Sequence, residues 1–498
     1  MYSKLYQKIK NWYVPITLLL ICCLGALRIV HINHSFWQDE ITTSWVVGGN
    51  FADIFTRCWI NNLSPLYFIF IYLSKIFFGF SESALRIPGI ITGILTIPII
   101  YKIAYKLNGS SKLSLFAAFL ASIDFWLVYY SLEVRPYSFV VFLAVIHIYI
   151  FLLFLQNNKP IFYAVLLSLM SGLIIVMHYT AATLCLVELF IAIIYFYKEK
   201  KFSKEIIYGL LIYTLIPIVI LLPFMPHIKY LFANKALLGS FIEKQNVAAI
   251  FLIYPHFINY MLLPLIIGGF VEYSQRKNTN CNFFTFEFFF ILSWYFIPIL
   301  THWIVTNMDI AHIFRDRYLA WIMPAPIIGS VIIIKNFQSR MAKTTFIIVL
   351  LLLTVTDYFP DFNLRFIENI FQKNYQQNVE SNVTVGEFGW KEAVSFINHS
   401  NMSINKIYVI PGLVEAKMLH MNIHNDKLIK SYLLSSVNSI YKLDKSYLNI
   451  AEPIYSMADI PDSESNYLVV SYGNPLDIKN STEISPNKNS IIHIYYIK

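Results

Sequence analysis

Long apolar runs, separated by short polar segments, dominate the first 360 residues of the chain. Each run approaches the roughly 20 residues that a helix needs to cross a bilayer. The runs occupy residues 12–30, 85–105, 112–130, 136–155, 160–178, 180–197, 206–226, 249–271, 284–304, 317–335 and 344–359. This pattern predicts an all-α polytopic membrane protein with about eleven transmembrane helices.

One further apolar stretch, residues 65–80, is shorter and contains Lys75. Basic clusters at residues 4–10 and 102–112 both belong on the cytoplasmic side by the positive-inside rule. After the first span, the chain therefore crosses the membrane only once more before residue 102. The run at 85–105 supplies that crossing, so residues 65–80 are expected to lie along the outer interface as an interfacial helix.

The character of the chain changes after residue 360, where Asn, Ser and Lys become prominent and no membrane-length run follows. Residues 389–400 are typical of a short helix. Strand patterns follow at residues 406–410, 466–472 and 490–498. We therefore predict two domains: a membrane domain over 1–360, and a small soluble α/β domain over 361–498 on the outer, extracytoplasmic face.

Composition agrees with this division and excludes several classes of protein. Hydrophobic residues make up 57% of the chain, aromatic residues 17% and charged residues 13%, and the mean hydropathy is +0.57. A soluble protein carries roughly 25% charged residues, so a soluble cytosolic enzyme and a disordered chain are excluded. The net charge of +9 comes from short basic runs between apolar stretches, which indicates cytoplasmic loops and no nucleic-acid partner.

The remaining compositional features bear on location and redox chemistry. The five cysteines form no CxxC pair and none lies in the C-terminal region, which argues against a disulfide framework or a thiolate metal site. The first apolar run follows a basic segment and reads as a retained anchor. Richness in Lys, Ile and Asn is typical of an AT-rich bacterial genome. We expect a multi-pass protein of the bacterial inner membrane, with a cytoplasmic N-terminus.

The candidate chemistry follows from the same topology, because costly ionisable residues collect on the predicted outer face. Asp39 and Glu40 lie in the first outer loop, and Glu133 and Arg135 lie in the second. The others on this side are Arg86, His178, His227, Asp309, His312, Arg315, Asp316 and Arg317. A carboxylate can take the proton of an acceptor, and arginines can hold a leaving phosphate. The set therefore suits group transfer from an anionic lipid carrier.

Each of these residues also has a simpler interpretation. An adjacent Asp–Glu pair in a loop is most often solvated surface. Glu133 and Arg135 can form an interfacial ion pair, and arginines beside a membrane commonly contact lipid phosphate. His178 and His227 can be interfacial amphiphiles. What favours a functional site is that all of them fall on one predicted side of the membrane.

Five short motifs follow one another along the chain in a familiar order. They are Trp37–Glu40 (WQDE), Ser64–Tyr67 (SPLY), Ser81–Pro88 (SESALRIP), Tyr129–Tyr137 (YYSLEVRPY) and Phe314–Leu319 (FRDRYL). In this order they resemble the GT-C superfamily of glycosyltransferases. The nearest resemblance is to bacterial members of glycosyltransferase family 39 type, related to protein O-mannosyltransferases, aminoarabinose transferases and Rgt-type lipopolysaccharide sugar transferases.

The resemblance implies transfer of a sugar from a polyprenyl-phosphate donor to a cell-envelope acceptor, at the outer face of the membrane. The acceptor would be a lipopolysaccharide or other glycolipid, a polysaccharide, or a protein. Asp39 would be the catalytic base, with Glu40 as its neighbour. The residues that would bind donor phosphate and substrate are Arg86, Glu133, Arg135, Tyr137, His178, Arg315 and Arg317. No cofactor is required, although a divalent ion held by Asp39 and Glu133 is an open alternative.

Two other functions compete with this one. A transporter or flippase of a lipid-linked saccharide would use the same charges for binding without reaction, but it predicts ionisable residues across the membrane and symmetric halves. An O-antigen ligase or polymerase predicts a large outer loop between late spans. The charges gathered outside, the acids of the first loop and the large exported domain favour the transferase.

Overall fold

The structure is a computed structural model of the chain. It describes residues 2–60, 64–156, 159–235, 242, 244–275, 285–356, 389–400, 402–411, 427–454, 459–460, 464–472, 476, 481–485 and 492–497. The chain divides into two compact units. We call Met1–Ile29 with Gly89–Tyr375 the membrane unit, and Val30–Pro88 with Gln376–Lys498 the loop–sheet unit.

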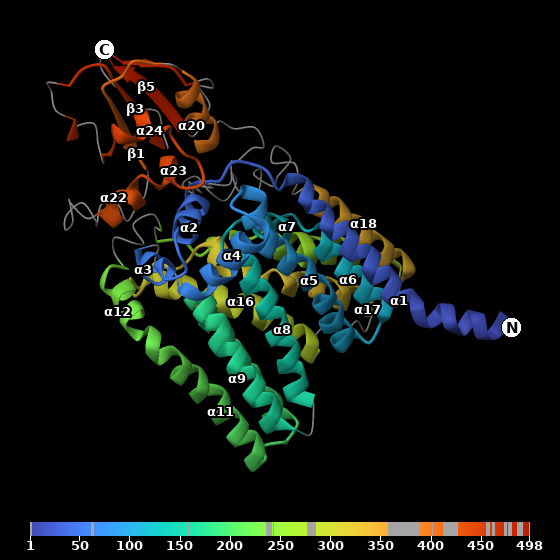
Figure 1. Ribbon diagram of the computed structural model, residues 1–498. Helices are drawn as coiled ribbons and strands as arrows, with labels where there is room; N and C mark the ends of the chain where they lie inside the picture. Colours follow the sequence, from blue (N-terminus) through green and yellow to red (C-terminus); the bar gives the residue numbers. More distant parts are fainter. Residues whose placement is uncertain are drawn as a thin grey trace. The chain divides into compact units, whose positions relative to one another are not determined.

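Helices make up the membrane unit (Figure 1). In chain order they are α1 (Tyr2–Ala26), η1 (Leu27–His31, which passes into the other unit), α5 (Glu82–Asn108, which begins there), α6 (Ser111–Ile123), α7 (Phe125–Leu132), α8 (Tyr137–Gln156), α9 (Pro160–Met177), η2 (Tyr179–Ala181), α10 (Ala182–Lys198), α11 (Lys204–Leu221), η3 (Leu222–Phe224), α12 (Met225–Ala233), α14 (Ala249–Leu252), η4 (Phe257–Leu262), α15 (Leu263–Gln275), α16 (Phe286–Asn307), η5 (Asp316–Ile322), α17 (Pro324–Asn336) and α18 (Arg340–Thr356).

The helices confirm a polytopic membrane protein. Among the described residues, eight helices are long and apolar enough to cross a membrane, and two bent pairs raise the number to as many as ten. These ten segments coincide with ten of the predicted runs. The remaining run, 344–359, corresponds to α18, whose described helix has 17 residues. The stretch at 65–80 forms the 14-residue helix α4 (Pro65–Phe78), which is too short to span a bilayer.

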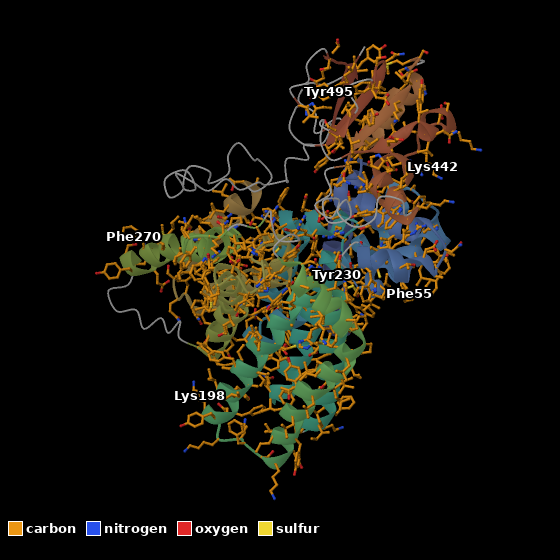
Figure 2. All side chains as sticks on the ribbon, turned by 90° about the vertical axis from the view of Figure 1, so that its left-hand side faces the viewer. Phe55, Lys198, Tyr230, Phe270, Lys442 and Tyr495 are labelled. Atoms are coloured by element: carbon orange, nitrogen blue, oxygen red, sulfur yellow. The ribbon has the colours of Figure 1, made fainter. Side chains whose placement is uncertain are left out.

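Apolar side chains cover the outside of the membrane unit as well as its core. Phe270 on α15 is 74% exposed and points away from the neighbouring helices (Figure 2). Leu352 on α18 is 62% exposed and Val219 on α11 is 63% exposed. A water-soluble protein rarely exposes apolar surface on this scale, whereas lipid tails accept it. The exposed surface therefore fits a bilayer environment.

Two acidic residues inside the membrane unit, Asp124 and Glu188, are paired with buried polar side chains. Asp124, at the break between α6 and α7, accepts from Leu127 N at 2.9 Å and contacts His256 Nε2 at 3.0 Å. Glu188 on α10 contacts His147 Nδ1 at 2.8 Å and accepts from the Tyr213 hydroxyl at 2.6 Å. Burial of a polar group is tolerated when it is hydrogen-bonded, so these acids are accounted for structurally.

A close helix approach positions the segment that follows α7. Ser138 at the start of α8 donates a hydrogen bond to the Gly89 carbonyl on α5 at 2.8 Å. A Cβ atom at Gly89 would lie 2.8 Å from the Ser131 carbonyl oxygen. Glycine therefore permits α5 to pack directly against the backbone that carries the YYSLEVRPY motif.

The loop–sheet unit joins the first predicted outer loop to the C-terminal region. Its helices are α2 (Gln38–Gly48), α3 (Asp53–Ile60), α4, α20 (Trp390–His399), α22 (Lys427–Leu433), α23 (Ser435–Asn438) and α24 (Lys445–Asn449). Its strands are β1 (Lys406–Ile410), β2 (Ala451–Pro453), β3 (Tyr467–Tyr472), β4 (Ser481–Glu483) and β5 (Ile492–Ile497).

The five strands form one mixed sheet in the order β2-β1-β3-β5-β4. Strands β1, β2 and β3 are parallel, and β5 pairs antiparallel with both β3 and β4. One face packs around Tyr408, Val469 and Tyr495, which are 3% exposed or less. The predicted strands at 406–410 and 466–472 and the helix at 389–400 are confirmed, and the strand predicted at 490–498 is confirmed over its described residues, Ile492–Ile497. With them the small C-terminal α/β region is confirmed.

The predicted domain boundary between residues 360 and 361 lies outside the described residues and stays a prediction. The compact units nevertheless divide the chain differently, because residues 30–88 pack with the C-terminal region. A contact of this kind joins segments that are far apart in sequence, which no local pattern reveals. Lys75, the charge that made 65–80 unsuitable as a span, donates to the carbonyls of Val47, Gly48 and Gly49 at 2.8–3.2 Å.

Candidate functional site

Asp39 lies in the first turn of α2, between two buried neighbours. Gln38 is 4% exposed and Glu40 is 2% exposed, whereas Asp39 is partly exposed. Successive helical residues are about 100° apart around the axis, so Gln38 and Glu40 flank Asp39 on either side. Burial of both neighbours fixes the direction in which this carboxylate faces.

Glu40 forms a buried ion pair with Arg86, at the start of α5. The Arg86 Nη2 atom lies 3.1 Å from Glu40 Oε1 and 2.9 Å from Oε2, and both side chains are 2% exposed. Glu40 Oε2 also accepts from the Trp37 backbone N–H at 3.2 Å, at the beginning of α2. The carboxylate therefore stabilises the helix start and compensates the arginine at the same time.

Arg86 also holds the segment before α2. Its Nη1 atom donates to the carbonyls of Ile32 at 2.9 Å and His34 at 2.7 Å. Its guanidinium lies 4.7 Å from the centre of the Phe36 ring. These contacts give Arg86 and Glu40 a structural role in the loop–sheet unit. Their predicted contacts with donor phosphate and acceptor stay predictions.

In the membrane unit, the motifs at Tyr129–Tyr137 and Phe314–Leu319 meet at His178. Glu133 and Arg135, between α7 and α8, and Tyr137, the first residue of α8, are buried, with exposed fractions of 7%, 8% and 2%. The Tyr137 ring lies 6.1 Å from the imidazole of His178, and the Tyr318 ring lies 5.1 Å from it. Three predicted segments, far apart in sequence, are thereby brought together.

The hydrogen bonds of His178 define its tautomer. Its Nδ1 atom lies 2.7 Å from the Thr180 hydroxyl, which donates to the Tyr318 carbonyl at 3.2 Å. Because the hydroxyl has a single proton, Nδ1 must carry the hydrogen and donate it to Thr180. The Nε2 atom of a neutral imidazole is then left as an acceptor.

Two arginines act on the charge of this histidine. Burial, together with the positive charges of Arg135 and Arg317 and the neighbouring His302, lowers the pKa of His178 to about 3. The imidazole is therefore neutral at physiological pH. Guanidinium groups are well suited to binding phosphate, so Arg135 and Arg317 beside this neutral ring are the candidate phosphate site in the membrane unit.

The other predicted residues occupy nearby positions with their own partners. Arg315 Nε lies 3.8 Å from Asp316 Oδ1, and the Arg317 guanidinium lies 5.8 Å from the centre of the Tyr318 ring. Tyr254 donates to the Asp316 carbonyl at 2.6 Å. His227 Nδ1 lies 2.9 Å from the hydroxyl of Tyr179, the first residue of η2.

Sequence reasoning missed Arg28, which lies near the end of the first span. Arg28 is 4% exposed, donates to the Ser131 hydroxyl at 2.8 Å and to the Gly25 carbonyl at 2.6 Å. It thus supports the YYSLEVRPY segment through its hydrogen bond to Ser131. Its position at the end of a long apolar run could have indicated its importance, because a charge near the membrane requires a partner.

The structure brings the predicted residues together in two groups. Glu40 and Arg86 meet beside Asp39 in the loop–sheet unit, and Arg135, Tyr137, His178 and Arg317 gather in the membrane unit. Convergence of the two groups on one substrate stays a prediction. Across the described part of the chain, no three His, Cys, Asp or Glu side chains gather as a metal site. The alternative of a divalent ion between Asp39 and Glu133 likewise stays a prediction.

Residues 62–230 match a protein family described as dolichyl-phosphate-mannose-protein mannosyltransferase. The matched region contains three of the motifs, at Ser64–Tyr67, Ser81–Pro88 and Tyr129–Tyr137. The motifs at Trp37–Glu40 and Phe314–Leu319 lie outside it. The match confirms the predicted resemblance to protein mannosyltransferases over this part of the chain.

Several solved structures are similar to this chain. The oligosaccharyltransferase of Archaeoglobus fulgidus in its apo form is 10% identical, with a TM-score of 0.47 over 84% of this chain and 61% of that one. Archaeal oligosaccharyltransferase AglB from the same organism, with an inhibitory peptide and a dolichol-phosphate, is 10% identical, with a TM-score of 0.45 over 93% and 70%. ArnT from Cupriavidus metallidurans bound to undecaprenyl phosphate is 10% identical, with a TM-score of 0.48 over 97% and 98%. No curated protein matches the chain.

The buried pair predicts the effect of removing one charge. Arg86→Met leaves Glu40 as an uncompensated buried carboxylate, so we expect a loss of roughly 3–5 kcal/mol in the free energy of unfolding. Adding Glu40→Gln should recover part of this loss, because an amide needs no counter-charge. The measurement is the midpoint temperature of unfolding in detergent. Lys201→Met, which breaks the exposed Lys201–Glu199 pair, is the control; an equal loss in both variants would contradict a buried, stabilising pair.

The low pKa of His178 predicts a pH effect on stability. Below pH 6.5 the unfolded chain protonates this histidine, whereas the folded protein does so only near pH 3. The unfolded state then binds more protons, so stability falls as pH decreases through this window. His178→Gln removes the uptake, and its midpoint temperature should decrease less than that of the wild type between pH 7.5 and 5. Equal decreases would show that His178 titrates normally.

Proposed function

We propose, from the match of residues 62–230 to the dolichyl-phosphate-mannose-protein mannosyltransferase family, that this chain is a membrane glycosyltransferase. It transfers a sugar from a polyprenyl-phosphate-linked donor to an acceptor of the cell envelope. The single geometric observation that supports this proposal best is the packing of the Tyr137 and Tyr318 rings against His178, which brings together the segments that carry Arg135 and Arg317. That arrangement suits the phosphate of a lipid carrier.

The donor phosphate would bind to the two arginines. A polyprenyl phosphate gains negative charge when its bond to the sugar breaks, and the guanidinium groups of Arg135 and Arg317 can stabilise that charge through charge-assisted hydrogen bonds. Glu133, Tyr137 and Arg315 would contribute to the same side of the substrate. The polyprenyl tail would lie against the apolar outer surface of the spans, which exposes side chains such as Phe270.

Asp39 would act as general base on the acceptor. It would take the proton of an acceptor hydroxyl or amine, the acceptor atom would form a bond to the anomeric carbon, and the bond from that carbon to the phosphate oxygen would break. Attack opposite the leaving phosphate inverts the anomeric configuration. The contacts of Glu40 and Arg86 support a positioning role, in which they hold the first turn of α2 and so orient Asp39.

The arginines can neutralise the leaving phosphate without a metal ion. A divalent ion held by Asp39 and Glu133 is the alternative, and loss of transfer on chelation with EDTA, with recovery on adding Mg²⁺ or Mn²⁺, would favour it. The distribution of basic residues supports a cytoplasmic N-terminus and reaction at the outer face of a bacterial inner membrane. The acceptor would be a glycolipid such as lipopolysaccharide, a polysaccharide or a protein.

The base assignment predicts the effect of one substitution. Membranes from host cells that lack the gene supply donor and acceptor, and purified protein is added to them. Wild-type protein should release polyprenyl phosphate and add one sugar mass to an acceptor, as measured by mass spectrometry. Asp39→Asn should slow transfer at least about 100-fold, because proton removal is lost. Its affinity for undecaprenyl phosphate should change less than about twofold, since Asp39 does not contact the leaving group.

Asp53→Asn is the matched control. Asp53 also lies in the first turn of a helix of the same loop, but it pairs with the partly exposed Arg57 at 3.5 Å. We expect it to retain wild-type transfer. Wild-type turnover by Asp39→Asn would exclude Asp39 as the base. Movement of the lipid-linked sugar across the membrane without release of polyprenyl phosphate would instead identify a flippase.

A further inference from the structure

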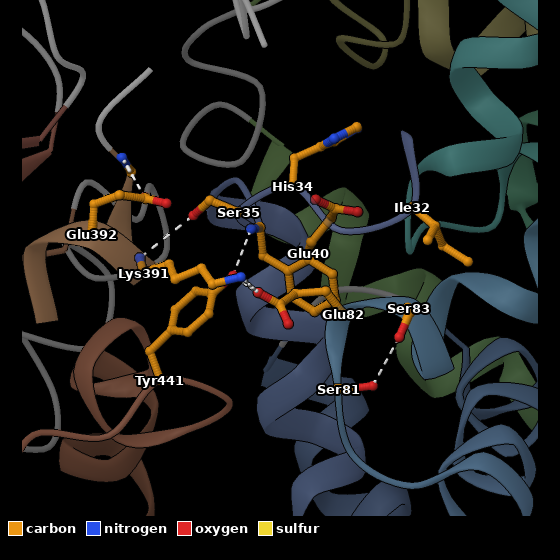
Figure 3. Close-up of polar contacts among 12 residues, drawn as sticks. Ile32, His34, Ser35, Glu40, Ser81, Glu82, Ser83, Lys391, Glu392 and Tyr441 are labelled. Carbon is orange, nitrogen blue, oxygen red and sulfur yellow. Dashed lines mark hydrogen bonds and ion pairs between the residues drawn. The ribbon is translucent and has the colours of Figure 1, made fainter. Parts of the chain in front are cut away.

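The C-terminal region contacts the loop that leads into α2. The Tyr441 hydroxyl accepts from the Phe36 backbone N–H at 2.8 Å and donates to Glu82 Oε1 at 3.3 Å. Lys391 Nζ lies 2.8 Å from the same Glu82 oxygen, and its backbone N–H donates to the Ser35 hydroxyl at 3.4 Å (Figure 3). These bonds join the C-terminal region to the segment directly before α2, which carries the candidate base, and to Glu82 at the start of α5.

One of these contacts reaches the residue next to Asp39. The indole Nε1–H of Trp390 donates to Gln38 Oε1 at 3.0 Å. Trp390 is 1% exposed and Gln38 is 4% exposed, so the bond is shielded from water. In a buried site the loss of one partner leaves the other polar group unsatisfied, which makes such a bond an effective constraint.

Trp390 is itself held in place at the start of α20. The Gly389 backbone N–H donates to Glu392 Oε2 at 2.9 Å, which caps this helix. A Cβ atom at Gly389 would lie only 2.6 Å from the Ser35 hydroxyl oxygen, so the absence of a side chain permits the close approach to the loop. The indole is therefore presented to Gln38 from a fixed helix end.

Both neighbours of Asp39 are thus anchored, by different parts of the chain. Arg86 holds Glu40 from within the first loop, and Trp390 holds Gln38 from the C-terminal region. Because the two neighbours flank Asp39 around the helix axis, the pair of anchors resists rotation of this turn in either direction. Release of one anchor would let the carboxylate turn away from its working direction.

The far end of α2 contacts the same C-terminal region independently. Trp45 Nε1–H donates to the Ser431 hydroxyl at 2.9 Å, and its ring lies 5.0 Å from that of Tyr432. The hydroxyls of Ser44 and Ser439 are 2.8 Å apart. Trp45 therefore forms the same kind of indole hydrogen bond to the same region, two turns away from Asp39.

We propose that Trp390 is a positioning residue for Asp39, which it orients through Gln38, and that the C-terminal α/β region is thereby a working part of the transferase. This inference rests on the proposed function. It assigns to the C-terminal region a role in the rate of transfer, separate from recognition of the donor. A misplacement of about 1 Å in a reacting group can lower a rate by about 100-fold, so a single distant bond can matter.

The test compares Trp390→Phe with Trp45→Phe in the membrane assay described above. Each variant keeps an aromatic ring and removes one indole N–H. We expect Trp390→Phe to lower the initial rate of transfer by about 10- to 100-fold while the dissociation constant for undecaprenyl phosphate stays within about twofold. Trp45→Phe should remain within about twofold of the wild type in both measurements.

Two combined variants show whether Trp390 acts through Gln38 and Asp39. Gln38→Leu should reproduce the loss, and the double variant with Trp390→Phe should lose no more than either alone. Added to Asp39→Asn, Trp390→Phe should leave the residual rate unchanged. A merely structural role would lower that residual rate and weaken donor-phosphate binding in parallel. If Trp390→Phe does not yield monodisperse protein, Gln38→Leu makes the same test from the other partner.

The outcomes separate this inference from the proposed function. Full turnover by Asp39→Asn would overturn the proposed function. Loss of turnover in Asp39→Asn together with normal rates in Trp390→Phe and Gln38→Leu would overturn the positioning role alone. Equal losses in Trp390→Phe and Trp45→Phe would also overturn it, because they would indicate general docking of the C-terminal region.

Discussion

The buried ion pair between Glu40 and Arg86 is the constraint on which the candidate site depends. Both side chains are 2% exposed, so water can solvate neither charge and each needs a partner within the protein. Arg86 is paired with the Glu40 carboxylate, which lies in the first turn of α2. It also donates to the carbonyls of Ile32 and His34, which belong to the backbone that leads into α2. The cost of breaking a buried pair is what fixes the helix that carries Asp39.

The same physical rule orders the membrane unit. Asp124 and Glu188 lie in apolar helices and are matched there by His256, His147 and Tyr hydroxyls. At the proposed phosphate site, burial, together with the positive charges of Arg135 and Arg317 and the neighbouring His302, lowers the pKa of His178, which stays neutral.

Much of the fold could be predicted from the sequence, because its main signals are local. Runs of apolar residues located up to ten candidate membrane segments of the described chain, and short strand-like segments located β1, β3 and β5. The partners of individual residues could not be predicted in this way. The sequence identifies Arg86 as a candidate site residue. It does not reveal the pairing with Glu40, because that contact joins two helices that are separate in the sequence. The Trp390–Gln38 bond links residues 352 positions apart, and neither residue stood out by type or spacing.

From the sequence we could predict only that Arg135, His178 and Arg317 lie on the same side of the membrane. Topology gives the side on which a loop lies but not the depth or direction of its side chains. The Tyr137, His178 and Tyr318 rings supply that information, since their packing brings the second-loop and late motifs together. Grouping of residues 30–88 with the C-terminal region has the same origin, in contacts between segments distant in the chain.

Mass spectrometry of the cell envelope, with and without the gene in the native host, tests the central claim most directly. The glycosyltransferase account predicts that one class of glycolipid, glycan or glycoprotein loses a single sugar mass in the deleted strain, while the corresponding polyprenyl-phosphate sugar accumulates. Restoration of the gene should restore the sugar. An envelope with unchanged sugar masses, in cells that express the protein, would contradict the account.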